Sequence, residues 1–557
     1  MIESVIELPS AANMNIDGTR TWVLRGDARM SLDELCDLSV PGRQIEVDGD
    51  TLARIERCRA KLSQYVERGR IMYGVNTGVG GFVDRLVPVE HAARLQNNII
   101  NAVATNVGDY LDDRTTRAIM LARIKSLARA NSAISVENFG KLVEMFNRGV
   151  TPCIPEKGSL GTSGDLAQLA SIALVATGQW KARFDGCELP GAEAMRRAGI
   201  EPMALSFKEG LALINGTSGM VGLGALVLAD AQALLNTYIG VSALSCEGLA
   251  GKTKPFDPRV HALKPHRGQQ RVAEMLWARL SDSKLALDED SVEQILAARM
   301  RGDPEACRGH LQIEDAYSIR CTPQILGPVL DSMAAIERVL EDELNSSNDN
   351  PLLIPEQDEL FHNGHFHGQY VAMAMDHLSI ALVTLCNLAD RRIDRFMTEA
   401  NSNGLPPFLC QNDAGLRLGL MGGQFMATSL TAENRGMCTP VSVQSLPSTG
   451  DFQDIVSFGF VAARRARTLL ANTKYVVAFE LMCACQAADI RGPLRLSASG
   501  RLLYEATRQI VPYLDHDIVL TDYLEALARE LLDGPIARSI NTHSVVQRRA
   551  LSLFRDA

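Results

Sequence analysis

The chain has 557 residues, of which 46% are hydrophobic, and its 56 basic and 66 acidic side chains give a net charge of −10. This length is sufficient for a large core and allows either several domains or one extended helical body. The acidic balance without a long basic run argues against nucleic acid as a partner.

Hydrophobic periodicity predicts a mainly α-helical protein. The first clear helical patterns cover residues 92–103, 115–130 and 166–176. Longer patterns, sparse in proline, follow at 209–248, 269–300, 325–347, 366–400, 412–435 and 453–488. These lengths predict a long-helix bundle.

The pattern divides the chain into an N-terminal mixed and helical region at 1–210, a central bundle at 211–490 and shorter helices at 491–557. The most apolar long run, 211–228, contains Asn215 and several glycines, which indicates a buried helix and not a membrane span. The N-terminus lacks a basic signal region, and the twelve cysteines form no C-x-x-C pair. We therefore expect a cytoplasmic protein with reduced thiols and no membrane partner.

The most informative segment is KGSLGTSGDL at residues 157–166. If the amide nitrogen of Gly164 attacked the carbonyl of Thr162, a five-membered ring would close, and glycine permits such a tight approach. Loss of water from this ring and from the Ser163 side chain would leave an exocyclic methylidene, an electrophile that no ordinary side chain supplies. The alternative is a surface turn or a helix cap, which Gly, Ser and Thr clusters usually form.

Two further polar segments lie in apolar surroundings. Tyr73 precedes a Gly-rich stretch at 74–81, which is typical of a phenol on a mobile lid, although a packing aromatic is the plainer interpretation. Asn215 opens a long apolar helical pattern, where a simple helix cap is the alternative.

Tyr317 and Arg320 are three residues apart, so on a helical turn they share a face. An arginine there can bind a carboxylate through two hydrogen bonds, or it can form a structural ion pair. NDNP at 348–351, HNGHFHG at 362–368 and GDFQD at 450–454 complete the set of polar motifs.

The three histidines His362, His365 and His367 raise the question of a zinc site. No H-E-x-x-H motif is present, and the nearby acids lack a familiar ligand spacing. We interpret them as core histidines or as histidines at the start of a helix, and we predict no metal.

Seven motifs, taken together and in order, resemble the aromatic amino acid ammonia-lyase and aminomutase family over about residues 30–500. The motifs are YGVNTG, GSLGTSGDLA, INGT, YSIRC, NDNP, GHFHG and FQD. The Thr-Ser-Gly triad replaces the Ala-Ser-Gly that is common in the family, and it is most similar to that of bacterial phenylalanine aminomutases. The resemblance implies a mainly α homotetramer with a long central helix bundle of the histidine and phenylalanine ammonia-lyase type, whose active sites draw residues from three subunits.

The resemblance also implies the residue roles. Thr162, Ser163 and Gly164 would cyclise to 4-methylidene-imidazol-5-one (MIO), and Tyr73 would act as a general base with a lowered pKa. Arg320 would bind the substrate carboxylate, while the other positions would orient or contact the aromatic amino acid. These other positions are Asn215, Tyr317, Asn350, Phe366 and Gln453.

The positions that resemble ring-selectivity sites are apolar in this chain. Ala102 and Val103 stand where tyrosine- and histidine-specific relatives carry histidine, and Thr449 and Phe452 stand where relatives carry Asn, Gln or Glu. Phenylalanine therefore fits best and histidine poorly, because an imidazole would lose its polar partners. Tyrosine stays open, because an apolar pocket rejects an added hydroxyl weakly.

The loop NTGVG at 76–80 is more similar to the lyase pattern, whereas the rest of the chain is more similar to the aminomutases. We predict an ammonia-lyase that forms trans-cinnamate or p-coumarate from L-phenylalanine or L-tyrosine. A phenylalanine or tyrosine 2,3-aminomutase is the alternative. A metal-dependent hydrolase is a remote alternative.

Overall fold

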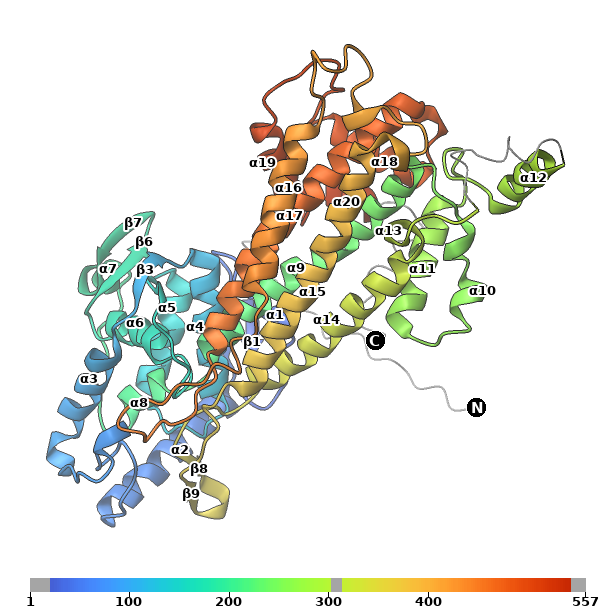
Figure 1. The fold of residues 1–557 in the computed structure, drawn as a ribbon. Helices are drawn as coiled ribbons and strands as arrows, with labels where there is room; N and C mark the ends of the chain where they lie inside the picture. Colours follow the sequence, from blue (N-terminus) through green and yellow to red (C-terminus); the bar gives the residue numbers. More distant parts are fainter. Residues whose placement is uncertain (1–20, 302–312, 542–557) are drawn as a thin grey trace. The chain divides into compact units, whose positions relative to one another are not determined.

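The computed structural model describes residues 21–301 and 313–541, and most of them are helical (Figure 1). The predicted mainly α fold is confirmed. Contacts divide the chain into two compact units. The first contains residues up to Leu226 together with Glu337–Met375 and Pro440–Arg464, and the second contains Val227–Ile336, Asp376–Thr439 and the residues from Arg465 onward. The three-part division stays a prediction, and its outermost residues, 1–20 and 542–557, lie outside the described ranges.

Small sheets and short helices form most of the first unit. Its strands are β1 (Thr21–Leu24) parallel to β2 (Gln44–Val47), β3 (Val107–Tyr110) antiparallel to β5 (Pro155–Lys157), the sheet β4 (Thr151–Pro152), β6 (Lys181–Phe184) and β7 (Cys187–Pro190), and the hairpin β8 (Leu352–Ile354) and β9 (Glu359–Phe361). Its helices are α1 (Leu32–Leu38), α2 (Gly49–Glu67), α3 (Ala92–Val103), α4 (Asp113–Ala128), α5 (Val136–Arg148), α6 (Leu166–Ala176), α7 (Gly191–Arg197) and α8 (Glu209–Ile214).

Local sequence signals set several of these helix ends. Asp48, Asp112 and Ser135 cap α2, α4 and α5 by accepting hydrogen bonds from the backbone amides three residues later. Gly149 ends α5 in the left-handed region at φ +75°. The predicted helices at 92–103 and 166–176 are confirmed to the residue.

Four long helices begin in one unit and end in the other: α9 (Ser218–Gly248), α14 (Thr322–Leu344), α15 (Gln369–Met397) and α17 (Gly459–Arg491). The second unit adds α10 (Pro258–His261), α11 (Arg267–Leu280), α12 (Glu289–Met300), α13 (Tyr317–Arg320), α16 (Met421–Met437), α18 (Ala498–Arg508), α19 (Thr521–Glu530) and α20 (Pro535–Asn541).

By length and composition α9 and α15 are apolar enough to cross a membrane, but 78% and 67% of their most apolar windows are buried inside the protein.

The helix predicted at 412–435 begins only at Met421, and two other predicted helices are interrupted. The predicted helix 209–248 is two helices, because Asn215 leaves the helical region and Gly216 adopts φ +144°. The predicted helix 269–300 is also interrupted, between the end of α11 at Leu280 and the start of α12 at Glu289. Both breaks coincide with short polar runs, NGTS at 215–218 and SDSK at 281–284, that interrupt the apolar periodicity.

A hydrophobic cluster in the first unit anchors the chain around Tyr73. Met72 and Val75 are buried together with α2 and with the β8–β9 hairpin, which lies beside α2 in Figure 1. The cluster members are Cys58, Leu62, Tyr65, Met72, Val75, Ala133, Leu353 and Leu360. The residues that follow β9 are therefore brought next to Tyr73.

Candidate active site

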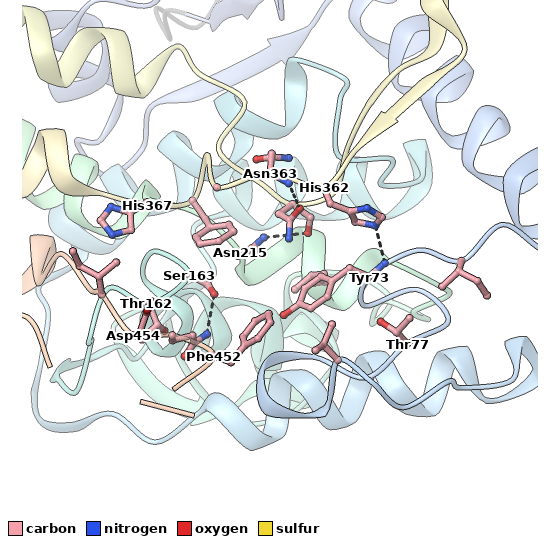
Figure 2. Close-up of a pocket in the computed structure, with 18 residues that line it drawn as sticks. Tyr73, Thr77, Thr162, Ser163, Asn215, His362, Asn363, His367, Phe452 and Asp454 are labelled. Atoms are coloured by element: carbon pink, nitrogen blue, oxygen red, sulfur yellow. Dashed lines mark hydrogen bonds between the residues drawn. The ribbon is translucent and has the colours of Figure 1, made fainter. Parts of the chain in front are cut away.

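A cavity of about 620 Å³ lies in the first unit, where segments that are distant in the sequence meet (Figure 2). Eight of the predicted site residues line it: Tyr73, Thr162, Ser163, Asn215, Asn350, Phe366, Phe452 and Gln453. The other lining residues are Ile71, Thr77, Val83, Leu211, His362, Asn363, Gly364, His367, Asp454 and Ile455.

The Thr162-Ser163-Gly164 segment is a tight turn at the wall of this cavity. Its backbone folds back so that Gly164 bridges to both Gly161 and Thr162. Gly164 has φ +74°, and a Cβ there would lie 1.9 Å from the Gly216 carbonyl oxygen. Only glycine can occupy this position, because any side chain would collide with backbone. The turn is therefore not an ordinary surface loop.

Two backbone hydrogen bonds hold the turn against the break between α8 and α9. Gly216 N–H donates to the Ser163 carbonyl at 3.0 Å, and Asp165 N–H donates to the Gly216 carbonyl at 2.8 Å. The α8–α9 break thus gives the turn its packing surface.

Asp165 fixes the turn from the other side. Its carboxylate accepts hydrogen bonds from Met220 N–H at 2.6 Å and from the Ser159 hydroxyl at 3.1 Å. Burial raises the pKa of this carboxyl to about 7, and these donors oppose the shift. Because Met220 lies in the first turn of α9, the helix dipole favours the charged form as well.

Gln453 brings an amide group to Ser163. Its Nε2 donates to the Ser163 hydroxyl at 3.4 Å, and Figure 2 draws this bond. The hydroxyls of Thr449 and Ser448 donate to its Oε1 at 2.9 Å and 3.3 Å. These two donors orient the amide so that its nitrogen faces Ser163.

Tyr73 presents its phenol to the cavity from the start of the Gly-rich loop. The phenol oxygen accepts a hydrogen bond from Gly80 N–H at 2.9 Å, and the ring stacks on Phe452 with 6.5 Å between centroids and 13° between planes. Burial raises the pKa of Tyr73, while the Gly80 amide opposes this shift. The prediction that its pKa is lowered is wrong for the isolated chain, because burial outweighs the single N–H donor.

A buried ionic group supports the two asparagines. Lys208 and Asp349 are fully buried and form an ion pair at 2.5 Å. Asp349 also accepts hydrogen bonds from the Asn215 side chain at 2.8 Å and from Asn350 N–H at 2.7 Å. Burial lowers the pKa of Lys208, and the Asp349 charge opposes the shift. Asp349 therefore fixes two cavity residues at once.

The remaining predicted site residues do not line this cavity. Ala102 and Val103 are at the C-terminal end of α3, and Thr449 acts through Gln453. Tyr317 and Arg320 belong to the second unit, where Arg320 pairs with Glu314 at 2.8 Å and its guanidinium lies 5.0 Å from the centre of the Tyr317 ring. The two do share a face, and their predicted contact with substrate stays a prediction.

Sequence reasoning interpreted His362 and His367 as core or helix-entry histidines and not as metal ligands, and it assigned no role to Asn363 and Asp454. The Nε2 of His367 is buried without a hydrogen-bond partner among the described residues. Within residues 21–301 and 313–541, no group of three or more His, Cys, Asp or Glu side chains is arranged to hold a metal ion. The signal that could have identified His362 and Asn363 is their position between two motifs, NDNP and GHFHG, that converge on one cavity.

A family model described as aromatic amino acid lyase matches residues 30–509. The chain belongs to the aromatic amino acid lyase family. The resemblance noted in the sequence is thereby confirmed, and so is the fold it implied.

Lyases and aminomutases both occur among the relatives. The chain is 58% identical to the structure of Pantoea agglomerans phenylalanine aminomutase, with a TM-score of 0.90 over 93% of this chain and 100% of that one. It is 39% identical to the tyrosine ammonia-lyase of Cupriavidus metallidurans over 96% of this chain and 98% of that protein. It is also 39% identical to the MIO-dependent tyrosine 2,3-aminomutase of Streptomyces globisporus over 91% of this chain and 94% of that protein. The chain is thus an enzyme of the ammonia-lyase and aminomutase type.

Proposed function

We propose that the protein removes the amine and a β-proton from L-phenylalanine, forming trans-cinnamate, by means of an MIO group made from Thr162, Ser163 and Gly164. The observation that carries this proposal is the Gly164 turn, which is pressed against Gly216 and opens onto the cavity that holds Tyr73. L-Tyrosine, which would give p-coumarate, is the second substrate.

The residues present fit an MIO group. The backbone folds back between Thr162 and Gly164, and the Gly216 backbone packed against Gly164 holds this tight turn in place. When formed, the group supplies an electrophile for the substrate amine. Gln453 and Asn215 stand at the cavity wall to hold its polar edge and that of the substrate.

Tyr73 is the proton acceptor in this proposal. Its oxygen faces the cavity and receives the Gly80 N–H, which stabilises a phenolate. Stacking on Phe452 holds the ring, so the oxygen is directed to one place. A positioned base of this kind contributes about 10²–10⁴-fold to a rate.

The cavity wall supports a phenyl ring over an imidazole. Ile71, Val83 and Leu211 are apolar lining residues near Tyr73, with Phe366 and Ile455 on other segments. Where the substrate ring lies against these apolar residues, an imidazole would leave its nitrogens without partners, which costs free energy. The phenyl ring of phenylalanine has no polar atoms, so its burial there does not carry this cost.

A 2,3-aminomutase is the second candidate, and the 58% identity to a phenylalanine aminomutase favours it. In this case the amine returns to the β-carbon of the retained arylacrylate and gives β-phenylalanine. The two outcomes share the elimination step and differ in how long the arylacrylate stays, which lid loops control.

The test is incubation of the purified protein with L-phenylalanine, L-tyrosine and L-histidine, with product separation by chromatography and Ser163→Ala as the control. Cinnamate with free ammonia supports the lyase, and predominant β-phenylalanine supports the aminomutase. Urocanate from histidine as the main product would overturn the substrate proposal. Activity in Ser163→Ala equal to wild type would overturn the electrophile.

A further inference from the structure

The segment between β9 and α15 contacts two cavity residues through its first two members. His362 Nε2 accepts a hydrogen bond from Tyr73 N–H at 3.1 Å, and Figure 2 shows the imidazole beside the Tyr73 backbone. Asn363 N–H donates to the Asn350 side-chain oxygen at 2.8 Å. One short segment therefore ties the base loop to the asparagine wall.

We propose that His362 is a positioning residue whose neutral Nε2 holds the Tyr73 backbone, and with it the direction of the Tyr73 phenol. The inference rests on the proposed function, in which Tyr73 accepts the β-proton. The hydrophobic cluster fixes Met72 and Val75 on either side of Tyr73, but Tyr73 itself is only half-buried. The backbone of the next residue is held as well, because Gly74 N–H donates to the Thr77 hydroxyl at 3.1 Å and the Gln96 side chain donates to the Gly74 carbonyl at 2.8 Å. The His362 bond restrains the Tyr73 amide itself.

The Tyr73 N–H donor fixes the protonation state of the His362 imidazole. Because an amide N–H points at Nε2, this nitrogen must carry its lone pair, so the proton resides on Nδ1 and the ring is neutral. An imidazolium has donors at both nitrogens and cannot accept the bond. Protonation of His362 would therefore release the Tyr73 backbone.

The surroundings favour the neutral ring at neutral pH. His362 is exposed, like His365, but its partial burial lowers its pKa, and the positive charge of Arg70 lowers it further. The Asp358 carboxylate on the same hairpin is taken up by Lys61 at 2.6 Å, and Glu359 begins β9. The other titratable side chains that line the cavity are Tyr73, His367 and Asp454.

The hydrogen bond between His362 and Tyr73 is expected to weaken at acidic pH. The pKa of His362 lies below its ordinary value when its Nε2 accepts the Tyr73 N–H, so this hydrogen-bonded arrangement favours the neutral imidazole. The restraint is fully present above the ordinary histidine pKa of about 6.5 and is lost as the pH falls through the lowered pKa. The acid limb of the activity profile would include this titration.

Two variants separate the positioning role of His362 from the effect of its titration. His362→Ala removes the acceptor, whereas His362→Gln keeps an oxygen at about the same distance from the backbone and does not titrate. We expect His362→Ala to lower kcat about ten-fold with a smaller change in KM, because it misplaces the base and not the binding groups. His362→Gln should retain most of kcat and lose the His362 contribution to the acid limb. His365→Ala, an exposed histidine of the same segment, is the matched control.

Hydrogen exchange of residues 71–80 supplies a readout that does not depend on activity. Exchange there should accelerate in His362→Ala, return toward wild type in His362→Gln, and remain unchanged in His365→Ala, with the thermal midpoint unchanged in all three. Unaltered kcat and exchange in His362→Ala would overturn the proposal, as would an acid limb in His362→Gln identical to wild type. A wild-type protein inactive on every substrate would count against the proposed function, while the exchange comparison would still decide whether His362 holds the loop.

Discussion

The two loops that bring chemistry to the cavity are held in opposite ways. The turn at 159–165 has Gly164 and Asp165 buried and is pressed against Gly216 by direct backbone contact. The base loop, residues 73–86, is buried only as far as Gly80, and beyond it Phe82 and Leu86 are 71% and 68% exposed. Few buried apolar contacts mean a low free energy of local opening. The difference agrees with the proposed function, which needs one loop that is fixed for its backbone to cyclise and one that can open for the substrate.

The largest effect is expected from Gly164→Ala. The added Cβ would lie 1.9 Å from the Gly216 carbonyl oxygen and 2.2 Å from its carbon, and these are backbone atoms that cannot rotate away as a side chain could. We expect activity to fall to background because the ring cannot close, with a loss of stability of at least about 3 kcal/mol. Intact-mass measurement for the loss of two waters and thermal unfolding would check both. Normal water loss in a stable variant would contradict the fixed-turn interpretation.

Tyr73→Phe should come next, and it acts only on the base loop. It removes the proton acceptor but keeps the ring that stacks on Phe452, so kcat should fall by about 10²–10⁴-fold with little change in stability. Water loss at the triad should remain complete, because the turn does not depend on this phenol. Tyr110→Phe, at a tyrosine of β3 outside the cavity, is the control. A variant that keeps wild-type kcat would show that Tyr73 is not the base.

The sequence predicted the position of the turn at Gly164 better than it predicted the tertiary contacts that hold this turn. The Gly164 triad and the helix at 166–176 follow from local composition and periodicity, and both are where they were expected. The break at Gly216 was missed, because its φ of +144° serves a tertiary contact with Gly164 that no periodicity reports.

Hydrogen-bond partners that are distant in the sequence could not be predicted for the same reason. The bond between Tyr73 and His362 joins residues 289 positions apart, so spacing carries no information about it. Ala102 and Val103 lie at the end of α3 and do not line this cavity, and their expected place at the substrate ring stays a prediction. Contacts of single residues depend on how the elements meet, which family resemblance indicates only by analogy.

Lys208→Met should sharpen the contrast by loosening the support of the turn more than that of the base loop. It would leave the fully buried Asp349 carboxylate without its ion-pair partner, which costs about 3–5 kcal/mol of stability. Because Asp349 holds Asn215, next to Gly216, hydrogen exchange should rise most at 159–165. It should rise less at 73–86, which is linked to Asp349 only indirectly, through Asn350 and residues 362–363. Denaturant unfolding measures the first effect, and the double variant with Asp349→Asn should recover part of the loss. Equal acceleration in both loops would show that they are not independent.

The smallest effect is expected from Gly80→Ala, which repeats the first substitution in the other loop. Gly80 also has a positive φ, +57°, but a Cβ there would meet only the Thr449 methyl at 3.8 Å, an ordinary contact. The cost is then the left-handed backbone alone, about 1–2 kcal/mol, and the N–H to the Tyr73 oxygen is kept. We expect kcat to fall by less than about ten-fold, with complete water loss at the triad. Gly186→Ala, at φ +74° in the open β6–β7 turn, carries the same strain away from the cavity and should lose similar stability without losing kcat. If Gly80→Ala instead blocked water loss as Gly164→Ala does, the base loop would be part of the structure that forms the electrophile, and the two loops would have to be treated as one fixed unit.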